Sequence, residues 1–179
     1  RDRSPSRGLG DVYKRQPTQS ATPTPAPIYL TLRDRILTAD PQEIGLSPTA
    51  DGPETWAVVM DMGWPDATVT LVGVGDGTTS LYFSNGGGII GAGESPQVAA
   101  TTDRFVAEAA DYLTEMTATE EYPLPETGRV RFTVMTYQGA YTADVAEAEL
   151  QQGQHPLSPL YALAQEVITQ VRLQQQSRQ

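Results

Sequence analysis

Residues 54–85 read ETWAVVMDMGWPDATVTLVGVGDGTTSLYFSN, and this stretch decides the fold. Three runs in it, 54–63, 68–75 and 80–85, are rich in β-branched and aromatic residues, and the first is apolar on both faces, as in a well-covered strand. WPDA and DGTT separate the runs, and Pro and Asp-Gly favour tight turns. Because such short connections join antiparallel strands, the sequence predicts an antiparallel three-stranded meander.

A segment with helical periodicity precedes the meander. Residues 27–37 read PIYLTLRDRIL, and a helix over them places Ile28, Leu32 and Ile36 on one face with charged residues on the opposite face. This is the pattern of an amphipathic helix.

The second half of the chain changes from helix to strand and back to helix. Residues 96–116 carry an apolar stripe at helical spacing, after the helix-starting pair Ser-Pro. Residues 129–137 alternate apolar and polar side chains, and Gln-Gly separates them from the strand-like run 140–145. A last helical pattern begins at Ser158. The order α-βββ-α-ββ-α predicts an α+β fold, an antiparallel sheet of about five strands with helices packed on it.

The chain divides into three parts by composition. Residues 1–16 hold five of the 12 basic residues, and the string resembles translated sequencing adapter, so we expect it to be non-native. The alternative is a basic arm that binds nucleic acid. Residues 17–27 are rich in Pro and Thr and predict a flexible linker. Residues 28–174 are expected to form a single α+β domain.

Charge and composition narrow the classes of partner. Residues 17–179 carry seven basic and 20 acidic groups, a net charge of −13, which disfavours nucleic acid and anionic membranes as partners. The chain has no Cys, which excludes disulfides, thiolate metal sites and Cys nucleophiles. No apolar run reaches the ~18 residues that span a bilayer. We expect a cytoplasmic protein, although the sequence begins without Met and leaves a preceding targeting signal open.

Five glycines fall between positions 86 and 93, in the sequence GGGIIGAG. Their spacing satisfies G-x-G-x-x-G, but the expected helix starts only after the glycines, and the neighbouring strands form hairpins rather than a parallel βαβ unit. No Lys-Ser/Thr pair follows, as a phosphate-binding loop requires. We therefore favour a structural loop, in which glycines allow positive φ while Ile89 and Ile90 anchor the loop in the core.

A second interpretation is that this loop binds a partner or a small uncharged ligand. The candidate contact residues are Ser84, Asn85, Gly86, Gly87, Gly88, Gly91, Gly93 and Glu94. Trp64 stands beside Pro65 in a predicted turn and is a candidate surface anchor if its side chain is exposed.

The sequence gives little support to catalytic or metal chemistry. His155 is the only histidine and has no evident nucleophile partner, so we expect it to position the last helix. One His without Cys makes a poor zinc site. Asp61, Asp66 and Asp76 match no calcium loop, and we expect them to serve strand ends and turns. We predict no catalytic residue, no metal and no cofactor.

Three segments carry a resemblance to known proteins: DMGWPDATVTLVGVGDGTTSLYFSNGGGIIGAGE, ETGRVRFTV and HPLSPLYALAQEVIT. They resemble a family of short uncharacterised bacterial proteins over about residues 28–172, which implies a bacterial source and no particular activity. The element order is also similar to profilin-like and roadblock-type platforms, which bind or dimerise through sheet edges and helices. We therefore expect a non-enzymatic protein-interaction or scaffold domain that binds a protein partner or itself as a homodimer. The alternative is a small-molecule binding protein or enzyme that uses the loop 84–94.

Overall fold

The computed structural model describes residues 23–49 and 54–177. The expected adapter segment, 1–16, and most of the expected linker, 17–27, lie outside the described residues.

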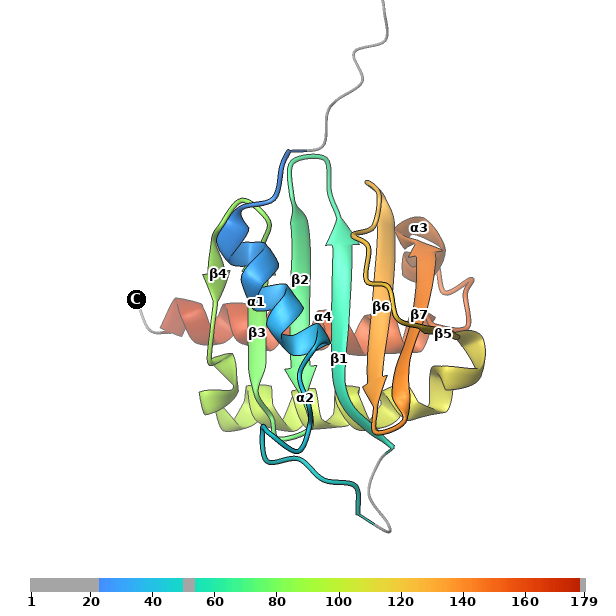
Figure 1. Ribbon diagram of the computed structural model, residues 1–179. Helices are drawn as coiled ribbons and strands as arrows, with labels where there is room; N and C mark the ends of the chain where they lie inside the picture. The colour runs from blue at the N-terminus through green and yellow to red at the C-terminus, as the bar shows by residue number, and fades with distance from the viewer. Residues whose placement is uncertain (1–22, 50–53, 178–179) are drawn as a thin grey trace, which may run out of the picture.

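The described chain is an α+β fold built on one antiparallel sheet (Figure 1). Its elements in chain order are α1 (Pro27–Leu37), β1 (Thr55–Gly63), β2 (Thr68–Val74), β3 (Thr79–Phe83), β4 (Gly88–Ile89), the 3₁₀ helix η1 (Ala92–Glu94), α2 (Pro96–Glu108), the 3₁₀ helix η2 (Ala109–Glu115), β5 (Thr117–Thr119), β6 (Arg129–Thr136), β7 (Gly139–Ala146), α3 (Glu147–Gln151) and α4 (Ser158–Ser177). The strand order in the sheet is β4-β3-β2-β1-β6-β7-β5.

The central meander forms as the sequence predicts. β1 pairs with β2, and β2 with β3, both antiparallel. The β2–β3 turn uses Gly77 at φ +81° and the Asp76 carboxylate, which accepts a hydrogen bond from the Thr78 amide at 2.8 Å. β1 also pairs with β6 on its other side, so this buried strand lies at the centre of the sheet.

The sheet has seven strands, not about five as expected, and the element order changes accordingly. The two additional strands, β4 and β5, have two and three residues and lie at the two edges of the sheet. Such short strands carry too few residues to show a period of two, and β4 lies inside the glycine run, where strand propensity is low. α3 also lies in a stretch for which no element is predicted from the sequence.

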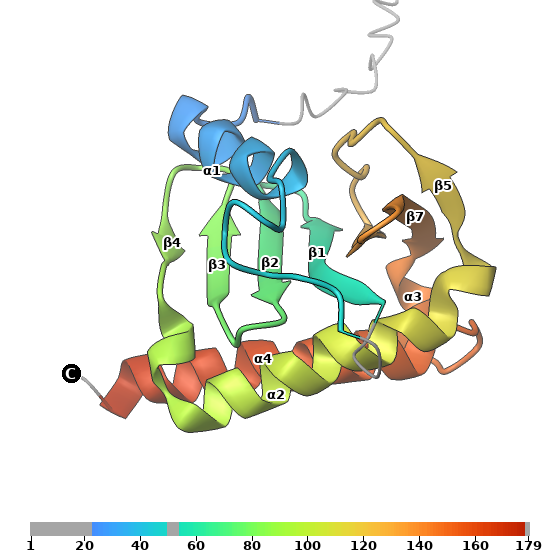
Figure 2. The ribbon, with the colours of Figure 1, turned by 60° about the horizontal axis from the view of Figure 1, so that its bottom comes forward.

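The helices cover the two faces of the sheet unequally. Figure 2 shows α2 and α4 side by side on one face and α1 alone on the other. Because side chains alternate along a strand, Val58, Met60 and Met62 of β1 enter the core beneath α2 and α4, whereas Ala57 and Val59 enter a smaller core beneath α1. Each face therefore has its own apolar cluster.

Local sequence explains where the longer helices begin. Ser95 precedes α2 and Pro96 is its first residue, as expected, although the Ser95 side chain makes no capping hydrogen bond. The helical stretch expected to reach residue 116 is α-helical only to Glu108 and continues as a 3₁₀ helix. At the start of α4, His155 Nδ1 accepts a hydrogen bond from the Leu157 amide at 3.1 Å, so His155 holds the entry to this helix.

No helix among residues 23–49 and 54–177 is both long enough and apolar enough to cross a membrane.

Candidate functional site

The face of helix α1 that packs on the sheet is not its most apolar face. Its buried residues are Tyr29, Arg33 and Leu37. Ile28, the first residue of the apolar stripe, is 56% exposed, and Leu32 and Ile36 are only partly buried. The apolar stripe that the sequence reveals thus lies at the margin of the contact with the sheet: Leu32 and Ile36 pack against the cluster beneath α1 with one side only, and Ile28 stands clear of it.

A buried ion pair explains this orientation. Asp61 projects from β1 on the α1 side and is fully buried, and its carboxylate meets the guanidinium of Arg33, a residue that is only 2% exposed. Arg33 Nη2 lies 2.7 Å from Asp61 Oδ2, and Arg33 Nε lies 3.1 Å from Oδ1. Such a two-pronged pair fixes distance and direction together. Turning α1 about its axis would break it and leave a buried carboxylate unpaired, which is costly.

Further hydrogen bonds complete the network around Asp61. Thr70 of β2 donates a hydrogen bond from Oγ1 to Asp61 Oδ1 at 2.5 Å. The Tyr29 hydroxyl lies 2.7 Å from Thr70 Oγ1, and because the Thr70 proton is already used, Tyr29 is the donor in this second hydrogen bond. Burial is the main cause that raises the pKa of the Tyr29 hydroxyl to about 12, and the negative charge of Asp61 is the second cause. Arg33 Nη1 also donates to the Tyr122 carbonyl at 2.9 Å. The network therefore joins α1 to β1, β2 and the segment before β6.

The displaced stripe forms one wall of a groove on this face. Two adjoining cavities of about 200 and 240 Å³ follow α1, and both are lined by Leu32, Tyr82 and Ile90. Ile28 lines the first cavity, and Ile36 and Ile44 line the second. We call this surface the α1 groove and define it by Ile28, Leu32, Ile36, Ile44, Tyr82 and Ile90.

Exposed apolar side chains concentrate at the α1 groove. Among the described residues, the large hydrophobic side chains with substantial exposure are Ile28, Leu30, Ile44, Trp64, Ile90 and Leu173. Three of these, Ile28, Ile44 and Ile90, line the groove. Ile90 is the most exposed of them at 67%, which corrects the expectation that it anchors the glycine loop in the core. Ile89, on the opposite face, does pack against the core.

The glycine segment shapes the β4 edge and one end of the groove. Gly86, at φ +99°, closes the turn between β3 and β4, where the Phe83 amide donates to the Gly87 carbonyl at 2.9 Å. Gly86, Gly87 and Gly88 line the smaller cavity of the groove. Ser84 is buried and accepts a hydrogen bond from the Thr68 amide at 2.8 Å. The exposed Asn85 accepts one from Gly87 within the turn.

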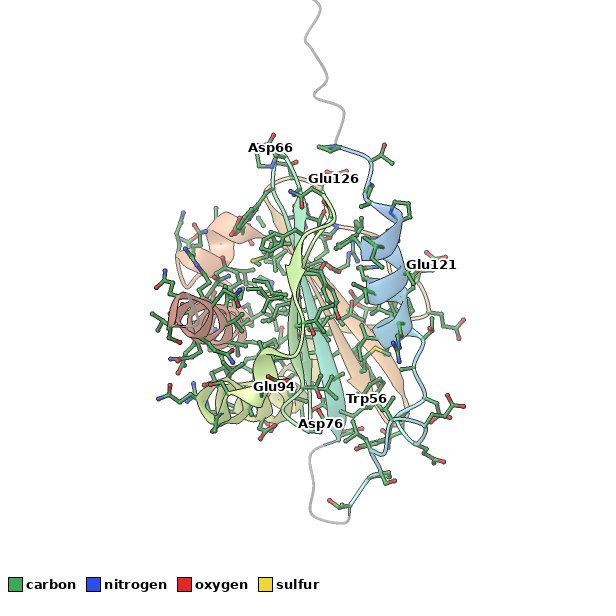
Figure 3. The ribbon with its side chains drawn as sticks, turned by 90° about the vertical axis from the view of Figure 1, so that its left-hand side faces the viewer. Trp56, Asp66, Asp76, Glu94, Glu121 and Glu126 are labelled. Carbon is green, nitrogen blue, oxygen red and sulfur yellow. The ribbon has the colours of Figure 1, made fainter. Side chains whose placement is uncertain are left out.

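The remaining candidate residues of the loop lie at the other end of β4. Gly91 has φ +73° and precedes η1, and a Cβ on Gly93 would overlap the backbone of Gly77. Glu94 is exposed and lies on the side of α2 and α4 (Figure 3). The structure thus brings Gly86, Gly87 and Gly88 to the groove, whereas Gly91, Gly93 and Glu94 do not line it.

Trp64 and the three aspartates occupy separate places. Trp64 is 45% exposed and lines a different cavity, between the sheet and α4. Asp66 and Asp76 lie at opposite ends of the sheet (Figure 3), and Asp61 is buried in the network beneath α1. Within residues 23–49 and 54–177, no three His, Asp or Glu side chains gather so that they could hold a metal ion.

No protein-family profile, curated protein sequence or solved structure matches this chain.

The pairing of Arg33 with Asp61 had a signal in the sequence. Asp61 interrupts a strand that is otherwise apolar on both faces, VVMDM, and a carboxylate buried there requires a cation or several donors. Arg33 is likewise a charged residue inside a predicted element, the amphipathic helix over residues 27–37. What the sequence could not show is that these two interruptions meet.

Proposed function

We propose that this domain binds another protein, and that the α1 groove receives an amphipathic helix with basic residues beside its apolar face. The observation that carries the proposal is the displaced stripe. A buried ion pair fixes α1 so that Ile28 is exposed, Leu32 and Ile36 are only partly buried, and all three border an open groove, although burying them fully against the sheet would remove more apolar surface from water. Contiguous exposed apolar surface of this kind is typical of interaction sites.

The form of the groove favours a helix as the bound element. Ile28, Leu32 and Ile36 recur every four residues along α1, so the stripe is about 12 Å long at 1.5 Å per residue. A partner helix can lay residues spaced by three and four positions into such a groove. Tyr82 and Ile90 line the groove along its length and provide the facing apolar surface.

Charge around the groove favours a basic partner. The described residues include 19 acidic side chains and six arginines, a net charge of −13. Ala39, Ile44 and Thr78 line the second cavity of the groove. The exposed acidic residues Asp40, Glu43 and Asp76 are their neighbours in the chain. Among residues 23–49 and 54–177, Arg35 is the only basic side chain that lines either cavity of the groove. Long-range attraction would therefore speed association with a basic helix and oppose an acidic one.

The test uses three labelled peptides of ~15 residues, a length at which isolated helices begin to form. The first has Leu and Lys in an amphipathic helical pattern, the second has Glu in place of Lys, and the third has the first composition in scrambled order. We expect fluorescence anisotropy to show binding of the first peptide only, weakening with added salt. Equal binding of all three peptides would contradict the proposal.

A pair of variants locates the site. Ile90→Lys places a charge in the groove on a side chain that is already exposed, and we expect it to raise the Kd at least tenfold, about 1.4 kcal/mol. Leu173→Lys is the control, because Leu173 is similarly exposed but belongs to α4 on the other face.

Sedimentation of both variants then tests self-association. A concentration-dependent dimer abolished only by Ile90→Lys would show that a second copy occupies the groove.

A further inference from the structure

A second cavity lies on the opposite face of the sheet from the α1 groove. Its volume is about 410 Å³, which is within the range of small-molecule sites. Its walls are apolar side chains of all four strands from β1 to β4, together with one face of α4, and Trp64 stands at its rim. The strand residues are Met62, Val69, Leu81, Phe83 and Ile89. We call it the α4 cavity.

The cavity exists because the helical cover of this face is uneven. At the β7 end of the sheet, α3 packs against both β7 and α4. At the β4 end, Figure 1 shows that α4 continues past the edge of the sheet, and the short helix at this end, η1, packs against β3 and α2. The corner between the carboxyl-terminal half of α4 and strands β1 to β4 is therefore left open.

The face of α4 that lines the cavity carries two polar residues. Gln165, Ile168 and Arg172 are spaced by three and four positions and so share one side of the helix. Elsewhere the buried residues of α4 are mostly Leu, Val and Ala. The two polar residues are seven positions apart, about 10 Å along the axis, with apolar surface between them.

Both polar groups have hydrogen-bonding capacity to spare. Gln165 Nε2 donates to the Met62 sulfur at 3.4 Å, and a thioether is a weak acceptor. Arg172 is exposed and makes no ion pair with any described residue. This is notable because the described residues as a whole include 19 acidic side chains and only six arginines. Arg104, Arg129 and Arg131 are all paired. A cation that lines an apolar cavity and pairs with no described side chain is suited to an anionic ligand.

We infer that the α4 cavity binds an amphipathic carboxylate, with its apolar body against the sheet and its carboxylate on Arg172. A guanidinium presents paired N–H donors that match the two oxygens of a carboxylate. The apolar lining supplies affinity by excluding water from the ligand chain, and the single cation supplies selection for an anion. Gln165 can turn its amide from the Met62 sulfur to a polar atom of the ligand.

The experiment uses decanoate as the probe, with 1-decanol and decyltrimethylammonium as neutral and cationic counterparts of the same chain length. Isothermal titration measures each Kd below the micelle concentration at pH 8. Nitrogen-15 spectra locate the site, because the chain has only two Trp indole signals. Trp64 lines the cavity, whereas Trp56 is buried in the cluster beneath α1 and serves as the internal reference. We expect decanoate to bind most tightly and to shift the Trp64 signal but not that of Trp56.

Two arginine variants test the role of the guanidinium. Arg172→Gln replaces an exposed side chain, so it leaves the fold intact, and we expect it to raise the Kd for decanoate at least tenfold while the Kd for decanol stays unchanged. Arg35→Gln is the matched control, because Arg35 is likewise exposed and without an ion pair in the described chain but lies on the α1 face. The inference is overturned if decanoate leaves the Trp64 signal in place, if the cationic probe binds as tightly, or if Arg172→Gln has no more effect than Arg35→Gln.

Discussion

The two faces of the sheet are covered by different physical means. Under α2 and α4 the contact is a continuous apolar cluster that includes Phe105, Phe132 and Leu160. Under α1 a smaller apolar cluster surrounds a buried polar network centred on Arg33 and Asp61. Apolar burial stabilises a helix in many orientations, because the hydrophobic effect has no direction. Hydrogen bonds and ion pairs have direction, so they can select one orientation even when it leaves apolar surface exposed.

This difference suggests a division of roles. The α2 and α4 face supplies most of the free energy of folding, because it buries the larger apolar cluster. The α1 face gives up part of its possible burial to keep Ile28, Leu32 and Ile36 beside the groove. Local departures from the best packing of this kind are expected where a surface serves a function.

The largest expected effect is on the better packed face. Phe105 of α2 is fully buried in the apolar cluster, and Phe105→Ala should lower the free energy of unfolding by about 3–5 kcal/mol through lost burial and a residual cavity. Urea denaturation measures the loss. Hydrogen exchange should accelerate across the whole sheet, because this cluster holds the domain together. A loss confined to the amides of α2 would break the comparison.

The next effect is on the polar face. Asp61→Ala leaves the Arg33 guanidinium buried without its carboxylate, and breaking a buried ion pair in this way typically costs about 3–5 kcal/mol. Because α1 can detach and let Arg33 reach water, we expect a loss near the lower end of that range. Hydrogen exchange should show the amides of α1 becoming unprotected while those of β6 keep their protection. If α1 stays as protected as in the wild type, the ion pair does not hold it.

Alkaline pH should weaken the packing of α1 on the sheet in the wild type. The variant Tyr29→Phe lacks the titrating hydroxyl, so its free energy of unfolding should fall less than that of the wild type between about pH 10 and 12. The Tyr29 hydroxyl loses its proton near pH 10 in the unfolded chain and at about pH 12 in the folded one. Its contribution is therefore complete below pH 10 and falls by at most about 1.4 kcal/mol per pH unit between pH 10 and 12. Tyr161, on the other face, also has a pKa raised to about 12 by burial and by its hydrogen bond to Glu147, so both proteins share that loss. Identical pH profiles for the two proteins would refute the role given to Tyr29.

The smallest effect concerns the β4 edge, which borders both the groove and the cavity. Gly91 has φ +73°, so Gly91→Ala should cost about 1–2 kcal/mol through backbone strain. Gly87→Ala is the control, since its φ is not positive and an added Cβ meets only ordinary contacts. Melting temperatures measure both. Equal stability of the two variants would show that the edge tolerates strain at Gly91.

The central part of the fold follows from the sequence, because period and turn chemistry act locally. The β2–β3 and β6–β7 hairpins form where two strand-like runs are separated by Asp-Gly and Gln-Gly. The edge strands β4 and β5 could not be predicted in this way, since their existence depends on the neighbouring strand and not on their own two or three residues.

The candidate site follows from the sequence much less well. The apolar stripe of α1 is visible, but its place beside the groove depends on Arg33 meeting Asp61, 28 residues away. The sequence predicts that the glycine segment forms one structural loop or, alternatively, one binding loop. Only its first three glycines reach the groove, because positive φ at Gly86 and Gly91 serves two separate turns at the two ends of β4.

The central claim is that the polar network sets the rotation of α1. The direct measurement is the solvent exposure of the Ile28 methyl groups, read from paramagnetic relaxation by a soluble nitroxide, with Leu173 as the reference. The variant Asp61→Leu/Thr70→Val makes the sheet side of the network apolar but keeps Arg33, whose guanidinium then lacks its carboxylate and is driven toward water. We predict that this variant folds and that relaxation at Ile28 falls as α1 turns its stripe toward the sheet. Unchanged relaxation at Ile28 in the folded variant would contradict the claim.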